Sequence, residues 1–139
     1  MADKRIFVDT HGFYVWADSD DPAHRKAEVI LRRSGRKFLT TEWIVVETVN
    51  LFVVRRKPHW ADNLLDVLMG TDAVRVVPAS TEQFQAARRL WRQYRDHGFP
   101  MTDCTSFAVM REMGVEDALT GDRHFRVMGF NPMLADRCR

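Results

Sequence analysis

The chain contains 139 residues with a formal net charge of +2 at pH 7, and 45% of its residues are hydrophobic while 29% are charged. This composition is that of an ordinary globular protein large enough for its own core, so we expect one domain over residues 1–139 and not a disordered chain. No apolar run reaches the roughly 18 residues of a membrane span and the first residues lack a signal-peptide cleavage site, so we expect neither membrane insertion nor export.

The first half of the chain alternates short apolar runs with helical patterns. Asp9 ends the first apolar run at a turn, and Gly35 closes the second predicted helix. Thr41 can cap the next helix, which must stop before Pro58 because the residue before a proline disfavours helical angles. The predicted elements are a strand at 5–8, a short helix at 13–17, a helix at 23–34, a strand at 37–40 and a helix at 42–56.

The second half continues this alternation. Ser80 and Gln83 form a capping box, and the helix that follows has apolar side chains on one side and arginines on the other. Thr102 can cap the next helix, Gly114 ends it, and Asp122 opens a final short helix. The predicted elements are a helix at 60–69, a strand at 73–77, helices at 81–97 and 103–112, and a strand at 117–120.

Strands that alternate with helices predict an α/β domain with a mainly parallel sheet, whose ligand site lies beyond the carboxyl ends of the strands. Three acids fall at that edge: Asp9 follows the first strand, Asp103 opens a helix after a loop, and Asp122 lies just past the last strand. Singly, each has a structural explanation. Asp9 suits a turn, and the other two suit helix N-termini, where the dipole stabilises an anion by about 0.3 to 1 kcal/mol.

Glu47 is harder to explain structurally, because it lies inside the apolar stretch WIVVETVNLFVV. Positions one turn away on the same helix carry no base, and an ionised carboxylate buried without a partner costs several kcal/mol. Four carboxylates gathered at one edge would also repel one another, so they are best explained by a shared cation. Oxygen ligands without Cys or paired His favour Mg²⁺ or Mn²⁺ over zinc.

The cysteines and arginines add weaker indications. Cys104 and Cys138 are the only cysteines, which is too few for a disulfide framework or a zinc site and suits a reducing cytoplasm. Most basic residues gather at 32–37, 55–57 and 88–95, where guanidinium groups could bind phosphates through forked hydrogen bonds. Solvated helix faces explain each of these clusters equally well.

Three segments resemble the PIN-domain ribonucleases, and more narrowly the VapC-like toxins of bacterial toxin-antitoxin pairs. They are FVDTHGFYVWADSDDPAHRKA, TTEWIVVETVNLF and MTDCTSFAVMREMGVEDALTGDRHFRVMGF, which occur in the family's order over nearly the whole chain. The resemblance implies a PIN-like three-layer α/β/α domain with a mainly parallel central sheet of four or five strands. It places the family's acids at Asp9, Glu47, Asp103 and Asp122, with polar support from Thr102, Ser106 and Thr120.

One position departs from the family's pattern. His11 stands where the family usually carries Ser, Asn or another small polar residue, which puts in doubt the local contacts to metal or substrate near Asp9. His124 lies in the third matching segment, and we interpret it as a structural residue.

The resemblance implies a metal-dependent endoribonuclease that hydrolyses RNA phosphodiester bonds with Mg²⁺ or Mn²⁺. As a toxin, it would be a cytoplasmic homodimer that pairs through apolar helix faces, with a small cognate antitoxin whose tail covers the acidic pocket. A housekeeping RNA-processing nuclease and a PIN-fold RNA- or partner-binding module without turnover are the alternatives. A haloacid-dehalogenase-like phosphatase is disfavoured, because that class needs a second Asp where this chain has His11.

Overall fold

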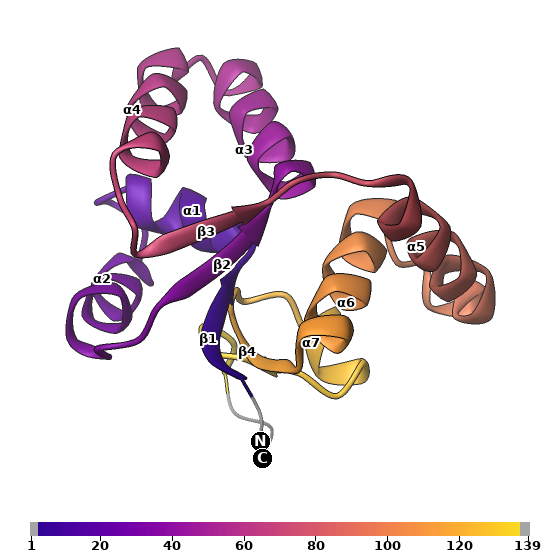
Figure 1. Ribbon diagram of the computed structural model, residues 1–139. Helices are drawn as coiled ribbons and strands as arrows, with labels where there is room; N and C mark the ends of the chain where they lie inside the picture. Colours follow the sequence, from indigo (N-terminus) through magenta and orange to yellow (C-terminus); the bar gives the residue numbers. More distant parts are fainter. Residues whose placement is uncertain (1–2, 137–139) are drawn as a thin grey trace.

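The computed structural model describes residues 3–136, which form three layers with helices on both sides of a central sheet (Figure 1). The sheet is entirely parallel and its strand order is β3-β2-β1-β4-β5. Its strands are β1 (Asp3–Val8), β2 (Phe38–Thr41), β3 (Val74–Val77), β4 (Val115–Leu119) and β5 (Asn131–Pro132). The predicted three-layer α/β/α domain with a sheet of four or five strands is confirmed, whereas Cys138 lies outside the described residues.

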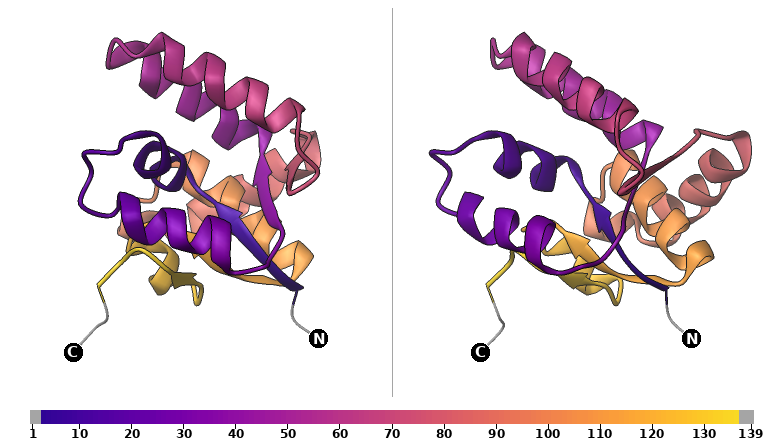
Figure 2. Two further views of the ribbon diagram at one scale, coloured as in Figure 1. Left: turned by 90° about the vertical axis from the view of Figure 1, so that its left-hand side faces the viewer. Right: turned by 60° about the vertical axis from the view of Figure 1, so that its left-hand side comes forward.

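Two groups of helices cover the sheet (Figures 1 and 2). The first group consists of α1 (Thr10–Ala17), α2 (His24–Arg33), α3 (Glu42–Val54) and α4 (Pro58–Met69). The second consists of α5 (Thr81–Gln93), the 3₁₀ helix η1 (Arg95–His97), α6 (Met101–Met113) and α7 (His124–Val127). Within residues 3–136, no helix has the length and apolar character that crossing a membrane requires.

Water is excluded from the centre of the sheet because helices cover both of its faces. Ile6, Phe7 and Val8 of β1 are almost completely buried, as the near-continuous apolar run of a central parallel strand predicts. β1 lies between β2 and β4, so the chain leaves the sheet at Asp9 beside the end of β4. Helix α3 contacts both α1 and α6, which brings the two helical groups together above this edge. The edge is therefore the meeting point of segments far apart in the sequence.

Most predicted helix boundaries are close to the observed ones. Thr41 caps α3 by accepting a hydrogen bond from the Ile44 backbone N–H at 3.2 Å, and Ser80 forms the expected capping box at the start of α5. The prediction that Thr102 caps its helix is wrong. Helix α6 already begins at Met101, after Pro100 in an extended conformation, because a proline is well tolerated where a helix begins.

Candidate active site

The four predicted acids lie at the carboxyl edge of the sheet. Asp9 directly follows β1, and Asp122 follows the end of β4. Glu47 is in the second turn of α3, and Asp103 is in the first turn of α6. Their charges act on one another: Asp103 and Glu47 both raise the pKa of Asp9, and Asp122 raises the pKa of Asp103. The fold thus gathers four side chains that are distant in the sequence.

Asp9 is the most deeply buried of the four, with 5% of its surface exposed. Its Oδ2 accepts a hydrogen bond from the Thr120 hydroxyl at 2.8 Å. Burial raises its pKa from 3.8 to about 7, and the neighbouring charge of Asp103 adds to this shift, while the hydrogen bonds from Thr120 and Thr10 oppose it. Hydrogen bonds therefore hold the Asp9 carboxylate in place, but they do not offset the cost of its negative charge in this buried, acidic site.

Glu47 is half-buried and is held by Thr10, the first residue of α1. The Thr10 hydroxyl donates to Glu47 Oε1 at 2.5 Å, and the Thr48 hydroxyl approaches Thr10 Oγ1 at 3.4 Å. The sequence interpretation did not single out Thr10, although its position next to Asp9 was a usable signal. This contact joins α3 to the turn after β1, so Glu47 and Asp9 are oriented by neighbouring residues.

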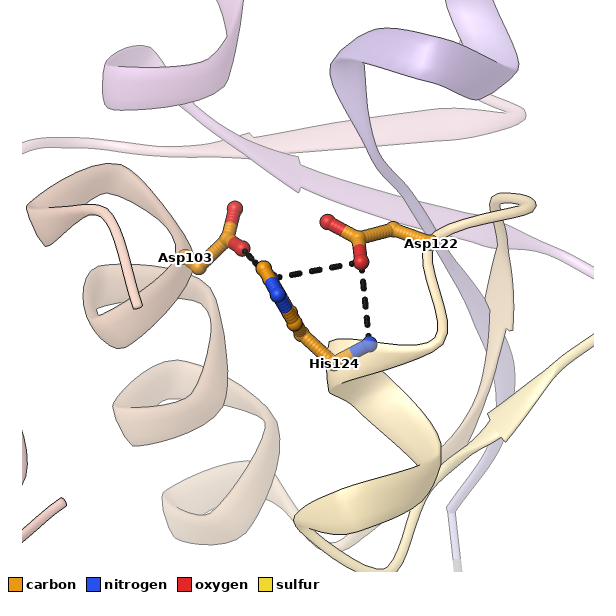
Figure 3. Close-up of side chains that lie close together, drawn as sticks. All are labelled: Asp103, Asp122 and His124. Carbon is orange, nitrogen blue, oxygen red and sulfur yellow. Dashed lines mark hydrogen bonds and ion pairs between the residues drawn. The ribbon is translucent and has the colours of Figure 1, made fainter. Parts of the chain in front are cut away.

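Asp103, Asp122 and His124 lie close together and could each offer one ligand atom to a metal ion (Figure 3). His124 Nδ1 lies 3.0 Å from Asp103 Oδ2 and 3.3 Å from Asp122 Oδ1. The His124 backbone N–H also donates to Asp122 Oδ1 at 2.9 Å. Burial raises the pKa of Asp103 to about 6; the His124 hydrogen bond opposes this shift and the Asp122 charge reinforces it.

The predicted supporting residues differ in what they contact. The buried Thr120 hydroxyl donates to Asp9 and accepts from the Asp122 backbone N–H at 3.1 Å, so it links two of the acids. Ser106 is also buried, but its hydroxyl donates to the Thr102 carbonyl within α6, at 3.3 Å. Thr102 lines a surface groove that also contains Glu47.

His11 connects the two turns that carry acids. Its Nδ1 accepts a hydrogen bond from the Gly121 backbone N–H at 2.8 Å. A side chain at Gly121 would lie 2.7 Å from the His11 ring, so the ring packs closely against this glycine. The residue that departs from the family's pattern therefore links the start of α1 to the turn after β4.

The donor set fits a hard divalent cation. The ion pairs found at these carboxylates among residues 3–136 join His124 to Asp103 and to Asp122. Clustered carboxylates that repel one another are stabilised by a bound cation, and carboxylate oxygens are the ligands that Mg²⁺ and Mn²⁺ prefer. A separate cavity of about 190 Å³ beneath α4 has mainly apolar walls, including Phe13 and Leu64, and lacks charged groups.

Comparisons with known proteins show which proteins the chain resembles. The family model of the PIN domain matches residues 6–131. The chain is 27% identical over 125 residues to the 23S rRNA-specific endonuclease VapC20 of Mycobacterium tuberculosis strain H37Rv, which covers 90% of this chain and 95% of that protein. The same values hold for VapC20 of strain CDC 1551 / Oshkosh.

Two solved structures share the fold. The crystal structure of M. tuberculosis VapC20, described as a Sarcin-Ricin loop cleaving toxin, has a TM-score of 0.84 at 24% identity and covers 91% of this chain and 97% of that one. VapBC2 from Rickettsia felis, bound to a DNA fragment from its promoter, has a TM-score of 0.66 at 9% identity and covers 91% and 95%. The family model spans most of the sequence, which confirms the family that the motifs indicated: the chain belongs to the PIN-domain family.

Proposed function

We propose that this protein is a metal-dependent endoribonuclease that hydrolyses RNA phosphodiester bonds and acts as a VapC-like toxin. The observation that carries the proposal is the convergence of Asp9, Glu47, Asp103 and Asp122 at one edge, where their charges raise the pKa of Asp9 and of Asp103. The similar VapC20 proteins are named 23S rRNA-specific endonucleases, which supports RNA as the substrate class.

The carboxylates would hold one or two Mg²⁺ or Mn²⁺ ions, with Asp9, Glu47 and Asp103 as principal ligands and Asp122 completing the set. A bound ion of this kind activates a water for attack and stabilises the charge that develops on the phosphodiester. The protein's own contribution is orientation. Thr120 holds Asp9 and Thr10 holds Glu47, so the ligands are positioned before the substrate arrives.

RNA would be bound mainly through its phosphates. The arginines of α5 and η1 and those that directly follow α3 are exposed and suit this role: Arg55, Arg56, Arg88, Arg89, Arg92 and Arg95. Arg36 is committed elsewhere, because its guanidinium donates to Asp117 at 2.8 Å and to the Lys4 carbonyl. Specificity would then come from RNA shape and unpaired bases, which single-stranded RNA exposes for contact.

A toxin of this kind would have a small antitoxin partner and would form a homodimer in the cytoplasm. The groove beside Glu47, lined also by Trp43, Val46 and Asn50, suits an antitoxin tail that covers the acids. The likeness in fold to VapBC2 of R. felis supports a partner of this type. Exposed valines on α3 and α4 suit the pairing of two copies through apolar helix faces.

The test uses the purified full-length chain and total RNA. We expect cleavage with Mg²⁺ or Mn²⁺, none with EDTA, and none with Asp9→Asn under either condition. Metal-independent cleavage, or no cleavage by a folded wild-type protein, would refute the nuclease. Induced expression in a bacterial host separates the biological roles, because a toxin arrests growth and Asp9→Asn does not, whereas a housekeeping nuclease is tolerated.

A further inference from the structure

The ring of His124 lies between Asp103 and Asp122. A purely structural role, as the sequence predicted, does not account for this position. We propose that His124 is a nitrogen ligand of the divalent ion, together with Asp103 and Asp122, and that this ligand makes the site prefer Mn²⁺ to Mg²⁺. The inference rests on the proposed function and specifies its metal requirement.

The distances between the candidate ligand atoms suit a shared ion. His124 Nδ1 lies 3.0 Å from Asp103 Oδ2 and 3.3 Å from Asp122 Oδ1, and one ligand atom from each of the three residues lies within 4.8 Å of the others. Neighbouring ligands of an octahedral ion, each bonded at about 2.1 Å, are about 3.0 Å apart. The three side chains therefore need only small adjustments to surround an ion.

The imidazole ring is also held in a defined orientation (Figure 3). The His124 backbone N–H donates to Asp122 Oδ1 at 2.9 Å, and the ring meets Phe99 edge-on, with 5.0 Å between centroids. Phe99 is itself buried and packs against Phe107. Although 39% of the His124 side chain is exposed, the contact with Phe99 and the approach of Nδ1 to the two carboxylates orient the ring, so that Nδ1 points toward Asp103.

Coordination requires a change of tautomer but no other reactant. Without an ion, Nδ1 faces two carboxylate oxygens, and only a tautomer with its proton on Nδ1 can donate to them. When an ion enters, this proton must leave Nδ1, and the coordinating tautomer carries its proton on Nε2. A bound ion would supply the positive charge between Asp103 and Asp122 that a neutral imidazole lacks, and the lone pair of Nδ1 would be free to face it.

A nitrogen ligand changes which ion is favoured. Mg²⁺ strongly prefers oxygen and keeps several waters, whereas imidazole binds well to transition metals. Mn²⁺ accepts carboxylate and imidazole ligands in the same octahedral site. A site with one imidazole among carboxylates should therefore bind Mn²⁺ more tightly than an all-oxygen site would, relative to Mg²⁺.

The experiment is pulsed electron paramagnetic resonance on the full-length protein loaded with Mn²⁺, because this method detects nitrogen bonded to the metal. We expect a hyperfine coupling between Mn²⁺ and a ligand nitrogen in the wild type. When histidine is labelled with ¹⁵N, this signal should move to the ¹⁵N frequencies. His124→Gln should lose the coupling. His97→Gln is the matched control, because His97 stacks on the same Phe99 ring at 5.2 Å, and it should keep the coupling.

Competition between the two ions gives a second readout. We expect the ratio of Mn²⁺ to Mg²⁺ affinity to fall about tenfold in His124→Gln and to stay unchanged in His97→Gln. A residue that only positions Asp103 would lower both affinities together and would show no nitrogen coupling, and this result would overturn the inference. The labelled wild type needs no variant, and absence of histidine coupling in it would overturn the inference even if His124→Gln misfolded.

The two proposals fail in different ways. Mn²⁺ that binds without histidine coupling, together with metal-dependent RNA cleavage, refutes the nitrogen ligand and leaves the nuclease intact. RNA cleavage that persists in EDTA, by a protein that binds neither ion, refutes the proposed function and the nitrogen ligand together.

Discussion

Asp9 is the residue at which burial and charge are most strongly opposed. Its pKa is raised to about 7 in the folded protein from 3.8, so between these values the folded state holds a proton that the unfolded state has lost. The stability of the metal-free protein therefore decreases as pH rises through this window. Asp103, whose pKa is raised to about 6, acts in the same direction, and together they make the empty carboxylate cluster destabilising above neutral pH.

Replacing Asp9 with Asn tests this opposition. We expect Asp9→Asn to raise the melting temperature of the metal-free protein above pH 7, to flatten its pH dependence between pH 4 and 7, and to abolish RNA cleavage. Mg²⁺ or Mn²⁺ should stabilise the wild type much more than the variant, because only the wild type has the full ligand set. Thermal unfolding in EDTA and with each ion measures both effects, and equal stabilisation by the ions would contradict the metal cluster.

Thr120 offers a second test at the scale of single atoms. Its buried hydroxyl donates to Asp9 Oδ2 and accepts from the Asp122 backbone N–H. Thr120→Val keeps the shape but leaves both partners without this hydroxyl, so we expect a loss of about 1 to 3 kcal/mol in the free energy of unfolding. Metal affinity should also fall by about tenfold or more, because the carboxylates lose their orientation.

Thr120→Ser is the matched control for this prediction. It retains the hydroxyl, so chemical denaturation and Mn²⁺ titration should place it close to the wild type. If Val and Ser behave alike, the hydroxyl is not what positions Asp9.

The four acids could be singled out from the sequence because Asp9 and Asp122 follow predicted strands, Asp103 opens a predicted helix and Glu47 lies in an apolar one. Their partners could not. Thr10 and Glu47 are 37 positions apart, and Asp9 and Thr120 are 111 apart, so no local pattern pairs them. His124 was interpreted as structural, because an isolated histidine in a sequence does not reveal that two carboxylates face its ring.

Helix α1 owes its position to a glycine on the face that meets β4. A Cβ at Gly12 would lie 2.2 Å from the Leu119 carbonyl oxygen, a backbone atom that cannot move without disturbing the strand. This close approach brings Thr10 and His11, at the start of α1, to the turn that follows β4. The site therefore depends on how closely one helix packs against one strand.

Gly12→Ala should separate this helix from the strand. We expect a loss of at least about 2 kcal/mol in the free energy of unfolding and a loss of metal binding, because overpacking a closely packed site typically costs about 1 to 3 kcal/mol. Gly35→Ala is the control: its site has open space and only a left-handed φ of +67°, so about 1 kcal/mol is expected. Denaturant unfolding of both variants measures the difference, and equal losses would contradict the steric account.

At the scale of elements, the sequence predicted most of the fold. Thr41 and Ser80 located the starts of α3 and α5, and Gly114 located the end of α6, because their side chains or backbone angles act locally. The first turn of α1 was missed, since Thr10, His11 and Gly12 read as a turn. Strand β5 has only two residues and is defined by its pairing with β4. Its own composition therefore did not predict it.

Two features of the whole molecule favour self-association. On α3, Val46, Val53 and Val54 are more than half exposed, and they recur at a spacing that places them on one face of the helix. Met69, at the end of the adjoining α4, is also largely exposed. Exposed apolar side chains along one face of a helix, as on α3, commonly mark an interface between proteins.

Val54→Lys tests the expected homodimer. We expect light scattering to give a dimer for the wild type and a monomer, or a dimer weakened about tenfold or more, for Val54→Lys. Val127→Lys is the control, because Val127 is similarly exposed but lies on α7, in the other helical layer. A wild type that is monomeric at micromolar concentrations would contradict the prediction.

The pairing of β1 with β4 has a consequence for the protein during its own synthesis. Asp9 acquires its hydrogen-bond partner only after a further 111 residues have been translated, and Asp122 and His124 follow later still. A nascent chain shorter than this has neither the complete set of ligands nor the strand that positions them. A ribonuclease with this topology would therefore be inactive while the ribosome synthesises it, because its active site forms only in the last steps of folding.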